Sequence, residues 1–248
     1  MTDPFTPLSQ APDAPPAAED SHHHADVSGG WLRPAVFGAM DGLVTNIALI
    51  AGVGGGGVSA HNVILTGFAG LVAGAISMGL GEYTSVRTQN DQVAFELAKE
   101  RRELERNPEA EAEELASMWI ERGLPADLAR QVAVAVGRNP DAALRLHAQE
   151  ELGVNPAEQP SPWVAAFSSF LCFSAGALVP LLPYLVGATQ LWLSLIVGGV
   201  GLFVAGALTA RFTNRRWYVS GLRQLVLGLA AAGATFLIGR AIGISGIG

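Results

Sequence analysis

The sequence predicts an all-α membrane protein with five transmembrane helices and a cytoplasmic helical insert between spans two and three. Two observations carry this prediction. Half of the 248 residues are hydrophobic and only 15% are charged, whereas soluble domains carry about 25% charged residues. Of the 22 acids, fifteen lie in residues 86–160 and five in residues 1–30, which leaves two for the other 143 residues. A region with so few carboxylates cannot keep a water-facing shell, so a single soluble globule is excluded.

The chain divides into four parts. Residues 1–30 are rich in Pro, Ala and acids, a composition that buries too little apolar surface to fold, and they are predicted to be a disordered tail. They show no basic stretch followed by an apolar one, so no secretory signal is expected there. The run His22, His23 and His24 in this tail would bind a transition metal only weakly, and its role stays open. The remaining parts are the first two spans in 31–85, the insert in 86–160 and the last three spans in 161–248.

Five apolar stretches have the length of membrane spans, each near the ~20 residues that cross about 30 Å of hydrocarbon. They are 33–54, 63–85, 163–187, 190–211 and 220–243. Fourteen of the fifteen Lys and Arg residues flank these stretches on one side, and such residues favour the cytoplasmic side. The N-terminus and the insert are therefore expected in the cytoplasm and the C-terminus outside. We expect a plasma membrane, with a bacterial inner membrane preferred over a vacuole.

The insert is helical in pattern. Residues 86–106 contain neither Gly nor Pro, so span two is expected to continue into the cytoplasm as one long helix until Asn107-Pro108. A second helix opens at Pro108, a residue suited to the first helical position, and ends at Gly123. Two shorter helices are expected at about 126–137 and 141–152.

Three residues within spans one and two are candidates for a transport path. Asp41 and Glu82 are the two acids of the membrane regions, where an ionisable group is costly and is seldom kept without a role. Met78 lies four residues before Glu82, so a thioether and a carboxylate share one helix face. That mixture suits a divalent transition ion, and the carboxylates could also take up protons. The alternative is that Glu82 reaches into the lipid headgroups and Met78 packs against another helix.

A second set of candidates lies in the insert, where carboxylate and imidazole groups recur at helical spacing. Its members are Glu100, Glu103, Glu111, Glu114, His147, Glu150 and Glu151. The first four form two i, i+3 pairs on either side of the turn at 107–108, so they can face each other across it. Such donors suit Fe(II), Mn(II) or Zn(II). The spacing fits equally well a solvated Glu-rich surface that pairs with neighbouring arginines.

Four sequence runs are similar to those of a known family. They are DGLVTNIALIAGVGG, AGAISMGLGEYTSVRTQ, a Glu-rich insert closing on EELG, and SPWVAAFSSFLCFSAGALVPLLPYL. From about residue 31 to 243 the chain resembles the vacuolar iron transporter family. The resemblance implies a proton-coupled exporter of cytosolic Fe(II), often able to carry other divalent metals. It also implies a five-span homodimer with the ion path at the subunit interface, and a cytoplasmic metal-binding domain beneath that path.

The resemblance assigns roles to individual residues. Asp41 and Met78 match intramembrane positions of the family's metal path, and Glu82 lies in the adjoining motif. The glutamates that match the family's cytoplasmic site are Glu100, Glu103, Glu111, Glu114 and Glu151. Some members have two methionines before the last of these, where this chain has His147 and Ala148. The soft sulfur ligands are therefore missing, and the preference among Fe(II), Mn(II) and Zn(II) stays open.

These observations predict a transporter and not an enzyme: a proton-coupled antiporter that exports Fe(II), with Mn(II) or another divalent transition metal as alternatives. Its expected partners are protons, the lipid bilayer and a second copy of the chain, with no cofactor beyond the divalent metal itself. A net charge of −7 argues against nucleic acid. One alternative is a membrane-anchored di-metal oxidase, although ferritin-like bundles use Glu-x-x-His and this chain has only the reverse order. Another is a gated channel whose insert senses metal.

Overall fold

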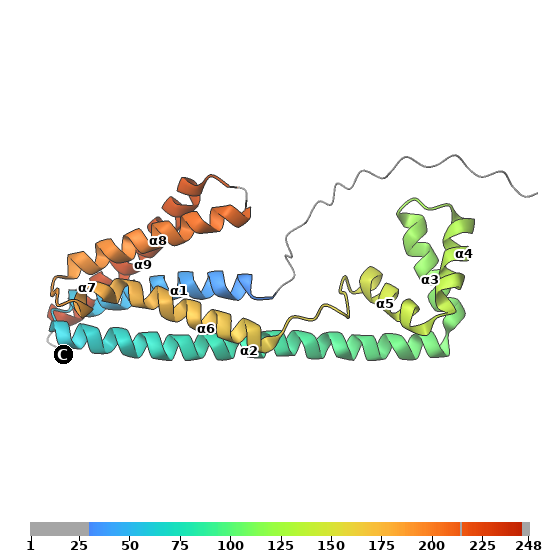
Figure 1. Cartoon of the computed structure of the whole chain (residues 1–248), viewed down its shortest axis with the longest axis horizontal. Coiled ribbons are helices and arrows are strands. Elements are labelled where there is room, and N and C mark those ends of the chain that lie inside the picture. The colour runs from blue at the N-terminus through green and yellow to red at the C-terminus, as the bar shows by residue number, and fades with distance from the viewer. Residues whose placement is uncertain (1–29, 214, 245–248) are drawn as a thin grey trace, which may run out of the picture.

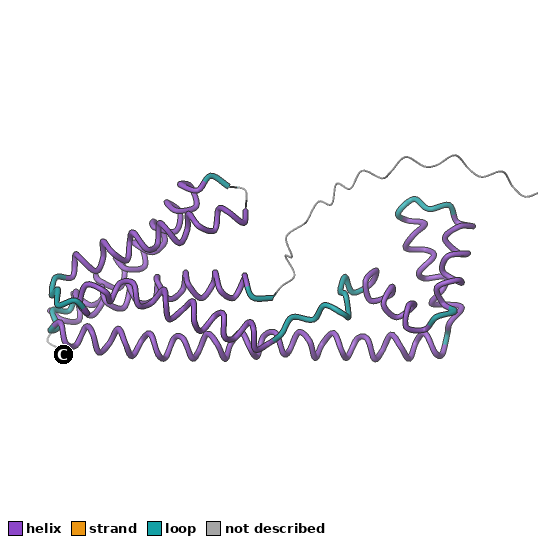
Figure 2. The backbone as a smooth tube through the Cα atoms, in the orientation of Figure 1, coloured by secondary structure: helices purple, strands orange, loops and turns teal. Residues whose placement is uncertain are grey.

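The computed structural model describes residues 30–213 and 215–244 of the chain, and every regular element in these ranges is a helix. Its elements are α1 (Leu32–Gly55), α2 (Ala60–Arg106), α3 (Pro108–Glu121), α4 (Ala126–Gly137), α5 (Pro140–Glu151), α6 (Pro162–Leu178), the 3-10 turn η1 (Val179–Leu181), α7 (Leu182–Leu185), α8 (Leu191–Thr213) and α9 (Trp217–Ile244). Short loops join most of them (Figure 2). The tail expected over residues 1–30, with its histidine run, lies outside the described residues except for Gly30.

Five helical segments are long and apolar enough to cross a membrane, which confirms the expected fold class. They are Leu32–Gly55, Ala60–Arg106, Pro162–Leu185, Leu191–Arg211 and Trp217–Gly243. Their outer faces are apolar: Phe37, Leu65 and Leu237 each have more than half of their surface exposed. Exposed side chains of this size suit contact with lipid or with another subunit rather than with water.

The second of these helices is much longer than a membrane is thick. α2 has 47 residues, which gives a length of about 70 Å at about 1.5 Å per residue, against about 30 Å of hydrocarbon. Figure 1 shows that the other four spans lie beside one half of α2. The helices α3, α4 and α5 lie at its other half. The helix ends at Arg106, Asn107 caps it, and Pro108 opens α3. The expected continuation of span two is thus observed.

The membrane helices pack closely because small residues line their contacts. α1 lies against α6 through Gly38 and Gly42, where an added Cβ would overlap the backbone of α6. Such small-residue contacts let helices approach closely in a membrane. Beside them Asn46 of α1 donates a hydrogen bond from Nδ2 to the carbonyl oxygen of Ala177, at 2.5 Å. α1 and α6 therefore form one tightly packed unit.

The insert has a small core of its own. Leu115 and Ala116 of α3 pack against Ala129 and Ala133 of α4, and Leu146 of α5 closes this cluster. The four residues named first are almost fully buried. This core holds α3, α4 and α5 together, and α3 and α5 also contact α2, which positions the side chains described next.

Candidate metal centre

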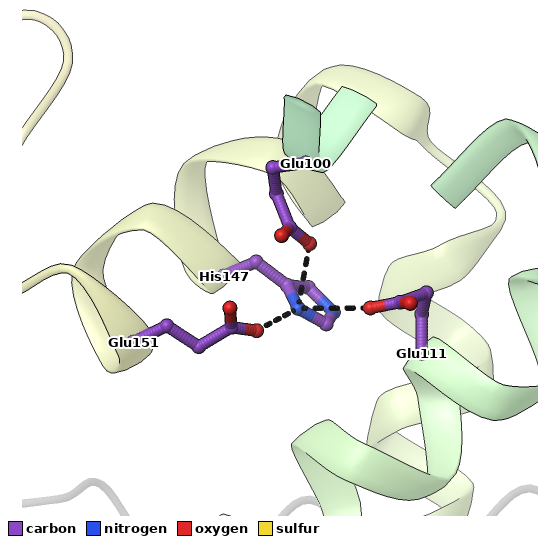
Figure 3. Close-up of side chains that lie close together, drawn as sticks. All are labelled: Glu100, Glu111, His147 and Glu151. Atoms are coloured by element: carbon purple, nitrogen blue, oxygen red, sulfur yellow. Dashed lines mark hydrogen bonds and ion pairs between the residues drawn. The ribbon is translucent and has the colours of Figure 1, made fainter. Parts of the chain in front are cut away.

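Four side chains of the insert converge on one point, where Glu100 comes from α2, Glu111 from α3, and His147 and Glu151 from α5 (Figure 3). One ligand atom from each lies within 4.8 Å of the others. We call these four residues the metal centre.

The local sequence explains why these residues meet. Glu100 lies six residues before the end of α2, and Glu111 lies in the first turn of α3. At Asn107 the chain turns sharply, and α3 rises from the end of α2 (Figure 1), which brings the two carboxylates close together. His147 and Glu151 are spaced i, i+4 on α5, and therefore share one helix face.

The imidazole of His147 occupies the middle of the group. Its Nδ1 lies 2.6 Å from Oε1 of Glu151, 3.1 Å from Oε1 of Glu100 and 3.8 Å from Oε2 of Glu111. His147 is 1% exposed, and Glu100 and Glu111 are also buried. A buried nitrogen donor thus stands among three carboxylates.

Crowding and burial perturb the acids of the centre. Burial, followed by the negative charges of Glu151, Glu111 and Glu103, raises the pKa of Glu100 to about 7, and His147 opposes this shift. Burial, followed mainly by the charge of Glu114, also raises the pKa of Glu111. Oε1 of Glu100 is buried and has no hydrogen-bond donor among the described residues. Buried carboxylates that repel one another in this way would be stabilised by a cation between them.

The donor set fits a divalent transition ion. Carboxylate oxygens and an imidazole nitrogen bind Fe(II), Mn(II) and Zn(II). Metal–ligand bonds of about 2.0–2.2 Å place donor atoms roughly 3–4 Å apart, so ligand atoms that already lie within 4.8 Å of one another need only a small contraction. The four residues are thus suited to hold a single ion.

The other three candidates of the insert lie outside this group. Glu103 is half-buried and Glu114 is exposed, and both act on the centre through their negative charge. Glu150 forms an ion pair with Arg122, and its Oε1 accepts a hydrogen bond from Nε1 of Trp119 at 3.3 Å. Glu150 therefore fastens α5 to α3.

Arg122 and Trp119 help to place α5, and the sequence did not predict this role. The sequence signal that could have indicated this role is an aromatic residue and an arginine near the end of α3, together with a pair of glutamates on α5. Part of the Glu-rich surface is also paired with arginine, as the alternative interpretation held. Glu113 forms an ion pair with Arg130 at 3.0 Å, and this pair lowers the pKa of Glu113.

The intramembrane candidates lie apart from the metal centre, in the spans. Asp41 of α1 is half-buried and accepts a hydrogen bond from Oγ1 of Thr45 at 3.3 Å. Met78 of α2 packs against the cluster that contains Phe173. Glu82 is buried, and its Oε2 has no hydrogen-bond donor among the described residues. At about 1.5 Å per residue, Asp41, Met78 and Glu82 lie about 21, 27 and 33 Å from the α1–α2 turn, and thus at three different depths of the membrane region. We call these three residues the membrane row.

Comparison with known proteins places the chain in a family. The family model that matches, described as the VIT family, covers residues 32–240. The chain is 32% identical to "Vacuolar iron transporter 1" of Oryza sativa subsp. japonica, over 91% of this chain and 92% of that protein. It is 38% identical to "Vacuolar iron transporter" of Acanthamoeba castellanii, over 77% of this chain and 74% of that protein. These relatives are named as transporters, in agreement with the expectation of a transporter rather than an enzyme. The chain belongs to the VIT family.

Proposed function

We propose that this protein is a proton-coupled antiporter that exports Fe(II) from the cytoplasm across the membrane. The observation that carries the proposal is that one unbroken helix bears both candidate sites. α2 carries Met78 and Glu82 in its membrane part and Glu100 of the metal centre in its extension. The names of the relatives support iron as the transported ion.

The metal centre would collect the ion at the cytoplasmic side. Glu82 and Glu100 are separated by eighteen residues of continuous helix, or about 27 Å, so an ion released from the centre starts near the mouth of the membrane region. The net charge of −7, with fifteen acids in residues 86–160, attracts divalent cations towards this surface.

The row of Asp41, Met78 and Glu82 would then conduct the ion. The two carboxylates supply negative charge, and the thioether of Met78 favours transition ions over Mg(II) and Ca(II). When the ion leaves, a carboxylate in the membrane is costly to keep charged, so it can take up a proton from the far side. This exchange couples metal movement in one direction to proton movement in the other.

The nitrogen of His147 bears on which ions are collected. Imidazole suits Fe(II) and Zn(II), whereas carboxylate oxygens alone suit Mn(II), Mg(II) and Ca(II). We therefore propose Fe(II) as the main substrate, with Zn(II) as a competitor and Mn(II) as a weaker substrate. The single four-residue centre also suits one ion better than the two that a di-metal oxidase needs.

A homodimer would complete the path. Asp41 is only half-buried in one subunit, and a second copy would bring its own Asp41 and more ligands to the same region. We further propose that the metal centre lies in the cytoplasm and the protein in a plasma membrane, with a bacterial inner membrane as the first choice.

Flux measurements in proteoliposomes test this proposal. Vesicles with an imposed pH gradient should take up Fe(II) and release protons when they contain the wild-type protein. Asp41→Asn should abolish both movements, whereas Asp91→Asn should leave them intact because Asp91 is an exposed partner of Arg87. Unchanged flux in Asp41→Asn, or Fe(II) flux without proton movement, would contradict the proposal.

A further inference from the structure

An ion pair joins the first two membrane helices at the Glu82 end of the row. Nη2 of Arg33 lies 3.7 Å from Oε2 of Glu82. Arg33 is in the first turn of α1, and at about 1.5 Å per residue both residues lie about 33 Å from the α1–α2 turn. The two antiparallel helices therefore bring the guanidinium to the level of the carboxylate.

The two partners have very different surroundings. The side chain of Glu82 is 8% exposed, whereas that of Arg33 is 72% exposed. A buried carboxylate needs a counter-charge, because removing it from water is costly. The guanidinium supplies that charge from the exposed side of the pair. Because most of the Arg33 side chain is exposed, it can swing away from Glu82 without losing buried contacts.

The pair is also loose. A separation of 3.7 Å is longer than a hydrogen bond, and Oε2 of Glu82 receives no hydrogen bond from any described residue. Arg33 thus neutralises the carboxylate without occupying its lone pairs. This buried oxygen can therefore bind a cation directly once the guanidinium moves away.

We propose that Arg33 is a displaceable counter-ion of Glu82, which holds the buried carboxylate until a divalent cation takes its place. This inference rests on the proposed function, because it treats Glu82 as part of the transport path. A guanidinium cannot lose its charge, so it repels a cation that binds Glu82 and moves outward. A divalent ion can replace it, since such an ion has twice the charge and bonds directly to the oxygen.

Competition of this kind sets both affinity and selectivity. Every entering ion must displace Arg33, so its apparent affinity is lower than the bare carboxylate would give. A monovalent cation has no more charge than the guanidinium and cannot displace it. Arg33 would therefore act as a specificity-determining residue that favours divalent over monovalent cations.

Fe(II) flux by variants of the full chain in proteoliposomes tests the inference. Arg33→Gln should lower the KM for Fe(II) at least threefold with little change in maximal flux, and it should make that flux sensitive to inhibition by K⁺. Arg33→Lys keeps the charge and should resemble the wild type. Arg87→Gln is the matched control, because Arg87 is also exposed but pairs with Asp91 at 3.1 Å.

Two further measurements separate displacement from a general field effect. In the Glu82→Gln background, Arg33→Gln should have no additional effect on KM, since the pair is already absent. If Glu82→Gln abolishes flux, Arg33→Cys in a Cys172→Ser background replaces this cycle. A reagent that attaches an ethylammonium group to the introduced thiol should then restore the wild-type KM. A reagent that attaches an uncharged methylthio group to the same thiol should not.

The outcomes distinguish this inference from the proposed function. A KM unchanged in Arg33→Gln, or lowered equally by Arg87→Gln, overturns the role of Arg33 alone. Fe(II) flux that is unaffected by Glu82→Gln overturns the place of Glu82 in the path, and with it both proposals.

Discussion

Nδ1 of His147 lies 3.1 Å from Oε1 of Glu100, and this contact joins α5 to the long helix α2 across 47 residues of sequence. Glu111 adds α3 to the same point. Because three helices must be in place before the donors converge, binding of a metal ion at this point would be coupled to folding of the insert. A change at any one of these side chains should therefore alter both metal affinity and the stability of the insert.

His147 should control which ion the centre prefers. Replacing it by Gln removes the nitrogen donor while keeping a polar side chain of similar size. We expect Zn(II) binding to weaken roughly tenfold or more and Mn(II) binding to weaken less. Titration calorimetry on the full chain in detergent measures both, with Glu113→Gln as the control, because Glu113 is exposed and pairs with Arg130. Equal losses for the two metals would argue against nitrogen ligation.

Glu100 should affect stability and metal binding in opposite directions. Glu100→Gln removes a buried carboxylate whose charged form is disfavoured by burial and by Glu151. The metal-free insert should therefore become more stable near pH 8, seen as slower hydrogen exchange of α5, while Zn(II) affinity falls. A loss of both would instead indicate a structural role.

The metal-free insert should lose stability as pH rises. The pKa of Glu100 is raised from 4.5 in its unperturbed form to about 7 in the folded protein, so the folded state binds more protons between these values. Stability then falls as pH increases through this window and stays low above it. Hydrogen exchange from pH 5 to 8 follows this change, and Glu100→Gln should flatten it.

Metal affinity should change with pH in the opposite sense. A carboxyl group must be deprotonated to bind, so Zn(II) affinity should increase from pH 6 to pH 8, by up to about tenfold per pH unit for one proton released. Calorimetry in buffers of different ionisation enthalpy counts the protons. An affinity independent of pH below 7 would contradict the raised pKa of Glu100.

Variants of the centre can separate a collecting role from a gating role. Glu100→Gln combined with Glu111→Gln weakens the centre and leaves the membrane row intact. If the insert collects ions, the KM for Fe(II) should rise several-fold while maximal flux at saturating Fe(II) is preserved. A fall in maximal flux with unchanged KM would instead show that the insert gates the path. Glu113→Gln, which alters only an exposed pair with Arg130, is the control.

The helices were predictable because their signals are local. The apolar lengths of the spans, the absence of Gly and Pro over residues 86–106, and Pro108 at a helix start need no knowledge of tertiary contacts. The family resemblance was predictable for the same reason, since its motifs are continuous runs.

Which glutamates converge was only partly predictable. Spacing alone does not show whether Glu100 or Glu103 joins the centre, because the packing of the helices decides which of the two side chains points towards it. Glu150 and Glu151 present the same problem. Arg122 and Trp119 engage Glu150 and leave Glu151 for His147. The pairing of Arg33 with Glu82 likewise depends on the relative position of two antiparallel helices, which no single motif records.

The continuity of α2 has a mechanical consequence. With no Gly or Pro between Glu82 and Glu100, the stretch that joins them behaves as a stiff rod of about 27 Å. A tilt of about 10° around its membrane end would swing the far carboxylate by about 5 Å, which follows from that length. Because α3 and α5 contact the same end of α2, the four residues of the centre would move together through this distance. A small rearrangement in the bilayer could thus shift the whole centre relative to the mouth of the membrane region.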